Sequence, residues 1–449
     1  MTNEPAKRDG SLRPLFTSLT WTRVQQIGFS VADQGFSVGG MFLLNIALAR
    51  TQPKEEYGVF ALAYSIFAFL SGLHNAAILE AYTIHGSGRY HQHFNEYSRF
   101  IQRSNAWLCA GIAGTLLTVW LILHWAAPHL ASRTVLGMAL TCGVFLAASF
   151  RRATFYIRRR PDLAARFSAI FFVVCAVTLW IFMEANKLNG LSAFLIAASA
   201  WLIAFLFVGR APSAGASGRR FEDIEPELWA EHWKYSRWVL VTAFIFQFTG
   251  QAYYWLAAAL LSVKETGDLR ALYNLVTPVD QFFAAVMMLI LPMMSFRYAS
   301  RRMSGLLPFW KAYSCVVLLV TAGFALTVNI FGRSLMHLLY SGNFDDVSPL
   351  LGTLVLLPVI MGIGNSINAA LKASEKPQAV FAAYVASGAG TFIFGLPLIR
   401  KFGLRGVVYG MLASGALYTI TLCTGFFSLL QAERRLSPAL SAAKESVQL

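Results

Sequence analysis

The chain has 449 residues, of which 56% are hydrophobic and only 13% charged, with a mean hydropathy of +0.54 and a net charge of +15. A water-soluble chain would carry about 25% charged residues, so the composition excludes a soluble globular protein. The positive charge does not indicate nucleic-acid binding, because membrane proteins concentrate lysine and arginine beside the anionic cytoplasmic leaflet. We therefore expect membrane lipids, and no nucleic acid, as partners.

The apolar residues come in blocks of about 20 to 26, the length that a helix rising about 1.5 Å per residue needs to cross about 30 Å of hydrocarbon. In chain order these blocks predict helices over residues 24–48, 57–82, 104–127, 133–155, 164–183 and 189–209, and then over 236–262, 271–295, 309–331, 347–370, 376–399 and 404–430. The fold class they predict is an all-α polytopic membrane protein with 12 transmembrane helices in two six-helix lobes.

A short charged turn occurs twice. "ALARTQPKEEYGVFALAY" at 47–64 and "AAALLSVKETGDLRALYN" at 257–274 align after a shift of 210 positions, which places Lys54 on Lys264. The same shift carries the first six predicted helices close to the second six, and internal duplication of this kind is typical of transporters. We predict an N-terminal lobe over 1–209, a cytoplasmic linker with a short interfacial helix over 210–235, and a C-terminal lobe with a short tail over 236–449.

The basic residues predict the orientation. The densest cluster is "RRATFYIRRRPDLAARF", between the fourth and fifth helices. Segments rich in lysine and arginine stay in the cytoplasm, so this cluster predicts that both termini are cytoplasmic. The chain is then expected to be a multi-pass protein of the bacterial inner membrane.

No pattern indicates catalysis or a bound metal. The five cysteines fall inside predicted helices without metal or redox spacing, so they are interpreted as small packing residues. His85, His91 and His93 lie in one loop but form no metal motif. With no nucleophile elbow, phosphate loop or sizeable soluble domain, we expect no enzyme, no cofactor and no metal site.

Three acids lie within helical blocks: Asp33, Asp280 and Glu80. Asp280 falls near mid-membrane, where inserting a carboxylate costs about 2.5–3.5 kcal/mol. One hypothesis is that these acids bind a proton or sodium ion that is coupled to transport. The alternative is that each is hydrogen-bonded to a neighbouring helix and has only a structural role.

Uncharged polar residues also lie within the predicted helices, whereas no lysine or arginine is expected deep in any of them. Amide side chains can donate to and accept from sugar hydroxyls, and interhelical hydrogen bonding is the alternative use. The residues expected to line a central cavity are Gln34, Ser37, His74, Asn75, Gln247, Gln251, Gln281, Asn365 and Asn368. Most come from the first two helices of each half, as expected of a cavity at a repeat interface.

Several segments resemble the oligosaccharide flippases, the polysaccharide-transporter branch of the MOP (multidrug/oligosaccharidyl-lipid/polysaccharide, MATE-like) exporter superfamily. "LARTQPKEEYGVFALAYS" is similar to that family's junction of helices 1 and 2, and "FGRSLMHLLYSGNFDDVSPLL" to its junction before helix 10. "AALKASEKPQAVFAAYVA" is similar to its helix 10–11 turn, and "FGLRGVVYGMLAS" to the start of its helix 12. In order and spacing, these segments cover nearly the whole chain.

The resemblance implies a V-shaped pair of lobes that flips a polyprenyl-diphosphate-linked oligosaccharide from the cytoplasmic to the outer leaflet by alternating access, for cell-surface or exported polysaccharide synthesis. Relatives place arginines in the cavity to hold the diphosphate, and the nearest equivalents by position here are Arg23 and Arg237. Interfacial anchoring is the alternative role for both.

Two other functions stay open. The deep acids would suit an ion-coupled exporter of small cationic molecules from the same superfamily. The fold would also suit a non-transporting membrane subunit of a polysaccharide synthase or secretion complex, and such a polymerase or synthase complex is the protein partner that the resemblance implies.

Overall fold

The protein is all-helical in the computed structural model, which describes residues 21–87, 90, 93–126, 133–208 and 225–446. The first half of the chain forms one bundle. Its helices are α2 (Trp21–Thr51), α3 (Lys54–His74), the π-helix η1 (Asn75–Leu79), α4 (Glu80–Ser87), α5 (Phe94–Ala126), α6 (Arg133–Ile157), α7 (Pro161–Glu184) and α8 (Gly190–Phe207). The predicted linker 210–235 lies largely outside the described residues, and its end belongs to the next helix.

The second half forms another bundle, in which α10 consists of two helices. Arg301 and Arg302 have non-helical dihedrals, with φ of 51° at Arg302, so the chain turns sharply between the two parts. These parts supply the eighth and ninth predicted helices. The elements are α9 (Glu225–Leu260), α10 (Val263–Tyr340), η3 (Ser348–Leu350), α11 (Leu351–Leu354), α12 (Leu356–Ala373), α13 (Pro377–Gly390), η4 (Thr391–Gly395), α14 (Leu396–Phe402) and α15 (Leu404–Ser446).

Helices occupy all twelve predicted places in the described part of the chain. By length and hydropathy, 10 of them could cross a membrane. The two not among these ten are α9 and the first part of α10. The fold class is therefore as predicted, and the number of spans is about ten to twelve.

The backbone preserves the internal repeat at matching turns. Arg159 and Glu375, 216 positions apart, both adopt a left-handed conformation with φ of 55° and 58°. In each case the next residue's N–H closes the turn, from Arg160 to the Phe155 carbonyl and from Lys376 to the Leu371 carbonyl, both at 2.9 Å. This is the usual way to satisfy the last carbonyls of a helix, and here it joins the fourth helix to the fifth in each half.

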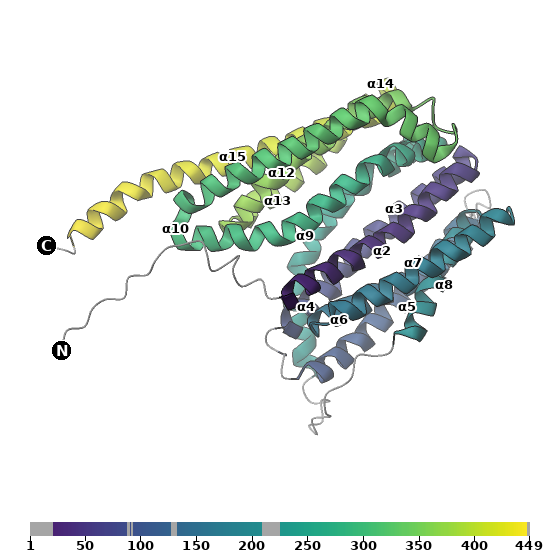
Figure 1. Cartoon of the computed structure of the whole chain (residues 1–449), viewed down its shortest axis with the longest axis horizontal. Coiled ribbons are helices and arrows are strands. Elements are labelled where there is room, and N and C mark those ends of the chain that lie inside the picture. Colours follow the sequence, from purple (N-terminus) through teal and green to yellow (C-terminus); the bar gives the residue numbers. More distant parts are fainter. Residues whose placement is uncertain (1–20, 88–89, 91–92, 127–132, 209–224, 447–449) are drawn as a thin grey trace.

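The two bundles meet at one end and spread apart at the other, so that the molecule is V-shaped (Figure 1). One apolar core runs through the meeting end and includes Phe60 and Phe194 from the first bundle and Leu272 and Tyr340 from the second. At the spread end each bundle has a core of its own. The shared core lies at one end only, so it does not fill the space between the arms of the V.

Candidate functional site

Two adjoining cavities lie between the bundles. One is about 220 Å³ and is lined from α2, α3, α6, α8 and α10, and the other is about 510 Å³ and is lined from α2, α3, α6 and α9 with η1. Both are lined by Tyr64, Phe67, Ser149 and Arg152, so they adjoin each other, and together we call them the central cavity. None of its lining residues, all of which are described, is acidic.

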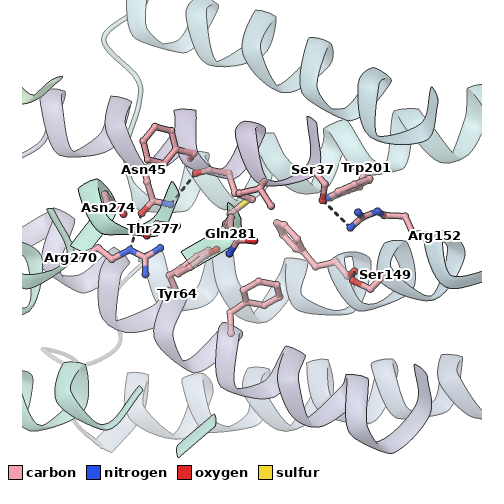
Figure 2. Close-up of a pocket in the computed structure, with 15 residues that line it drawn as sticks. Ser37, Asn45, Tyr64, Ser149, Arg152, Trp201, Arg270, Asn274, Thr277 and Gln281 are labelled. Carbon is pink, nitrogen blue, oxygen red and sulfur yellow. Dashed lines mark hydrogen bonds between the residues drawn. The ribbon is translucent and has the colours of Figure 1, made fainter. Parts of the chain in front are cut away.

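Arg270 points into one end of the central cavity from α10 (Figure 2). Its Nε donates to Asn45 Oδ1 at 3.3 Å, and its guanidinium lies over the Tyr64 ring at 4.4 Å. These two partners belong to the first bundle, whereas the Tyr254 ring, 5.9 Å from the guanidinium, belongs to α9 of the second. All three partners are neutral. Within the described chain, no carboxylate forms an ion pair with Arg270. The central cavity therefore holds one uncompensated positive charge.

Arg152 points into the central cavity from α6, where its two parts adjoin, and its charge is balanced (Figure 2). Its Nε and Nη2 donate to the two oxygens of Asp33 at 3.0 and 2.7 Å, and its Nη1 donates to Ser37 at 3.0 Å. Asp33 is fully buried and also accepts from Tyr156 at 2.7 Å and Ser168 at 2.5 Å. Planar bidentate pairing of this kind is the strong form of an ion pair.

Five of the predicted polar residues line the central cavity: Gln34, Ser37, Asn75, Gln247 and Gln281. They come from α2, η1, α9 and α10, as the repeat argument expects. The other polar residues predicted to line it do not do so.

Those others lie within or beside the bundles. His74 is buried and bonded to Asn105 at 2.6 Å. Asn368 is buried in the second bundle, where its amide donates to Tyr418 at 2.9 Å. Gln251 and Asn365 are partly buried and line neither part of the central cavity. For His74 and Asn368 the structure therefore favours interhelical bonding.

The three candidate acids have different surroundings, and none lines the central cavity. Asp33 belongs to the ion pair with Arg152. Asp280 accepts a hydrogen bond from Tyr273 at 2.8 Å and has no ion pair among the described residues, so it remains a candidate for ion coupling. Glu80 accepts a hydrogen bond from the Tyr235 hydroxyl at 2.9 Å, and this bond connects α4 to α9.

The arginines predicted to hold a diphosphate are not at the central cavity. Arg237 is exposed, and its guanidinium lies 5.8 Å from the centre of the Trp238 ring. Arg23 lies in the first turn of α2, and its side chain is outside the described part of the structure.

Two residues that line the central cavity, Arg152 and Arg270, are not among the predicted site residues. Arg152 and Arg270 were interpreted as parts of charged turns, because each lies near the end of an apolar block. The arms of the V bring both to the wall of the central cavity. Asn45, Asn274 and Thr277 were missed as well, although a polar residue within an apolar block was the available signal.

The spread end of the first bundle carries a polar contact with α9. His232 Nε2 and Ser236 both bond to the Ala77 carbonyl, at 3.0 and 2.8 Å, and this carbonyl belongs to the π-helix η1. The His232 Nδ1 lies 3.3 Å from the Tyr97 hydroxyl. Burial lowers the pKa of His232, the nearby His85 lowers it further, and the bond to Ala77 opposes both effects only in part.

No protein-family profile matches the sequence, and no curated protein matches it. Solved structures do match. The inward-facing conformation of a multidrug resistance MATE family transporter of the MOP superfamily superposes with a TM-score of 0.77, at 12% identity over 91% of this chain and 99% of that one. The outward-facing conformation of a transporter described in the same terms gives 0.61, at 12% identity over 91% and 96%.

A MOP superfamily transporter from Pyrococcus furiosus gives a TM-score of 0.64, at 12% identity over 90% of this chain and 95% of that one. It is reported to have a binding pocket of reversed polarity that suggests a different function. At this level of identity the likeness establishes the fold, which is that of the MOP superfamily transporters. None of the three neighbours is described as an oligosaccharide flippase, so that branch of the superfamily stays a prediction.

Proposed function

We propose that the protein is a membrane transporter whose substrate is anionic, and specifically that it flips a polyprenyl-diphosphate-linked oligosaccharide between the leaflets. The observation that carries the proposal is the charge of the central cavity. Arg152 is neutralised by Asp33, whereas Arg270 has only neutral partners. The site is therefore suited to attract an anion.

A diphosphate fits this site chemically. The planar guanidinium presents a fork of donors that matches phosphate oxygens, and Tyr64 holds the guanidinium of Arg270 flat from one side. Arg270 bonds to Asn45 through Nε and also lies beside Tyr254, so a ligand would bind through the guanidinium nitrogens that these two residues do not use. An anion there would remove the cost of an uncompensated charge between the helices.

The rest of the central cavity suits sugars. Beyond Arg270 its walls present the amides of Gln34, Asn75, Gln247 and Gln281 and the hydroxyls of Ser37 and Ser149. Amides and hydroxyls both donate and accept, as sugar hydroxyls do. Phe67 and Phe145 add apolar surface for the faces of sugar rings. A glycan could lie along this wall while its lipid tail stayed in the bilayer.

The same geometry counts against an exporter of cations. Such a protein needs an unpaired acid at its binding site, and no lining residue of the central cavity is acidic in the described structure. Asp33, which pairs with a lining residue of the central cavity, is already bound to Arg152.

The proposal is tested by depleting the protein in its native host and measuring polyprenyl-linked glycans by mass spectrometry. We expect one lipid-linked oligosaccharide to accumulate on depletion. Re-expressed wild-type protein should reverse this accumulation, and the Arg270→Gln variant should not. Lys264→Gln is the matched control, because Lys264 lies in the same helix, is exposed and does not line the central cavity.

Two outcomes would overturn the proposal. Greater sensitivity to cationic drugs without glycan accumulation would favour the cation exporter. If neither change occurred and the polymer were still lost, the protein would be better explained as a non-transporting subunit of a synthase complex.

A further inference from the structure

A further cavity lies at the spread end of the second bundle. It measures about 630 Å³ and is lined from the turn inside α10, from the turn between α12 and α13, and from α15. Two of its lining residues, Tyr298 and Leu429, also belong to the separate core at that end. We call it the turn pocket. It shares no lining residue with the central cavity, so it is not part of the site described above.

The turn pocket carries two charges of each sign. Its bases are Arg302 and Lys376, and its acids are Glu375 and Glu433. Arg302 Nη2 lies 2.9 Å from Glu433 Oε1, and the same oxygen accepts a hydrogen bond from the Tyr298 hydroxyl at 2.9 Å. Because the four charges cancel, the turn pocket suits a ligand that carries both a positive and a negative group better than a simple anion or cation.

Two of these four charges are not paired within the described structure. The side chains of Glu375 and Lys376 are exposed, and neither takes part in an ion pair there. Arg302 is paired, but its side chain is 63% exposed, so its guanidinium stays accessible. The turn pocket therefore offers two basic groups to an anionic part of a ligand and one free carboxylate to a cationic part.

The first bundle neutralises the charge at the corresponding position by itself. The turn between α6 and α7 has the same backbone form, and a shift of 216 positions places Lys376 on Arg160 and Gln378 on Asp162. Arg160 donates to both carboxylate oxygens of Asp162, at 2.9 and 2.8 Å, whereas Gln378 carries no charge. Lys376 thus lacks the partner that its counterpart has in the first bundle, and a bound phosphate would supply one.

The backbone at Arg302 is held by its surroundings. Its φ of 51° and ψ of −143° lie in a region that a non-glycine residue keeps only where neighbouring contacts fix it. The guanidinium lies 4.9 Å from the centre of the Tyr298 ring and pairs with Glu433. The Arg302 side chain is therefore already positioned beside the turn pocket before any ligand binds.

The residues around the turn pocket indicate its depth in the membrane. Phe296, Phe381 and Phe427 are large, exposed apolar side chains on the helices that form it. Each is five or six residues from a charged lining residue, which is about 8 Å along a helix. Exposed apolar side chains face the hydrocarbon, and exposed charges face headgroups or water. The turn pocket therefore lies at headgroup depth, and the orientation predicted from the basic residues assigns it to the cytoplasmic leaflet.

We propose that the turn pocket binds the headgroup of a phospholipid with a primary amine, of the phosphatidylethanolamine type. The phosphate binds Arg302 and Lys376, because guanidinium and ammonium groups both form charge-assisted hydrogen bonds to phosphate oxygens. The ammonium of the lipid donates to Glu375, and the acyl chains stay in the bilayer. The bound lipid then connects the turn inside α10 with the turn between α12 and α13.

The test measures lipid binding to the purified, delipidated full-length protein by native mass spectrometry. Phosphatidylethanolamine is compared with two lipids that have the same acyl chains. Phosphatidylcholine has a quaternary ammonium with no N–H to donate, and phosphatidylglycerol has no ammonium at all. We expect wild type to bind phosphatidylethanolamine at least fivefold more tightly than either of the other two.

Three variants assign the binding to the turn pocket. Lys376→Gln should weaken the binding of all three lipids severalfold, because it removes a phosphate contact. Glu375→Gln should weaken only the binding of phosphatidylethanolamine and bring it to the level of phosphatidylcholine. Both side chains are exposed, so both variants should fold. Lys372→Gln is the matched control: Lys372 is exposed, precedes the same turn and does not line the turn pocket, so binding should be unchanged.

Four outcomes would overturn the proposal. Equal affinity of wild type for the three lipids would remove the headgroup selectivity, and a selectivity that persists in Glu375→Gln would place it elsewhere. Tighter binding of phosphatidylglycerol would assign the turn pocket to anionic lipids. Glycerophosphoethanolamine, which has the same headgroup without acyl chains, should compete only at far higher concentration than the lipid. Competition at equal concentration would assign a soluble ligand instead of a lipid.

Discussion

Replacing Asp33 by asparagine is the sharpest test of how the central cavity is held together. The Asp33 carboxylate is fully buried and accepts four hydrogen bonds, two from Arg152 and one each from Tyr156 and Ser168. Asparagine keeps the shape but loses the charge, and it turns one acceptor into a donor. That donor would face groups that are themselves donors, and Arg152 would lose its counterion.

The expected loss can be bounded. Removing one partner of a buried pair costs about 3–5 kcal/mol, because the other charge is left uncompensated. The Arg152 side chain is 17% exposed and borders the central cavity, so water can partly solvate it, and we expect about 3 kcal/mol. Replacing both members, Asp33→Leu with Arg152→Met, should fall within about 1 kcal/mol of wild type, since apolar replacements of buried pairs are often neutral.

The free energy of unfolding is measured for each variant in mixed micelles by tryptophan fluorescence, as a double-mutant cycle. Ser37→Ala is the control: it removes one neutral acceptor from Arg152 and should cost about 1 kcal/mol or less. If Asp33→Asn were as stable as wild type and transport lost its dependence on an ion gradient, Asp33 would be a coupling residue, contrary to this argument.

Three further predictions follow from single residues. Asp280→Asn should change the unfolding free energy by about 1 kcal/mol or less, because Tyr273 can donate to the amide oxygen instead. The same variant should remove the dependence of transport on an imposed proton gradient. Transport that still follows the gradient would exclude Asp280 from coupling. Gly58→Ala should lower the melting temperature and transport, because its Cβ overlaps the Val263 carbonyl, whereas Gly250→Ala meets open space and should do neither. A wild-type melting temperature in Gly58→Ala would contradict the close contact of α3 with α10. The pKa of His232 is lowered in the folded protein, so the unfolded protein takes up a proton first as the pH falls. The melting temperature should therefore begin to fall as the pH drops below about 6.5. His232→Gln should abolish this pH dependence, and an unchanged dependence would assign it to other groups.

The sequence predicts the helices well because the hydrocarbon core demands a long apolar block wherever the chain crosses it. It predicts the site less well, and Arg270 shows why. The predicted helix begins at residue 271, where hydropathy rises, but α10 begins at Val263, where the Ser262 side chain caps it. Hydropathy reports depth in the membrane, whereas a helix begins where its backbone is capped. Arg270 was therefore assigned to a turn.

The partner of Asp33 could not be predicted from the sequence for a different reason. Its depth was apparent from the sequence, and so was the choice between a coupling carboxylate and one satisfied by a neighbouring helix. Its partner Arg152 is 119 positions away, and no local pattern joins them. A polar residue in an apolar block must face either a cavity or a partner, and Ser37 and Gln281 both lie at the central cavity.

The repeat explains why a charged turn occurs twice, and its divergence explains where function can arise. Shifted by 210 positions, Lys264 falls on Lys54, Asp268 on Gly58 and Arg270 on Phe60. Both turns start a helix, and the two helices can cross closely because each contributes a glycine at the crossing. Phe60 packs in the shared core, whereas Arg270, at the matching position, borders the central cavity. Symmetry thus accounts for the close contact between two like bundles, and the loss of symmetry at this one position gives the space between them its charge.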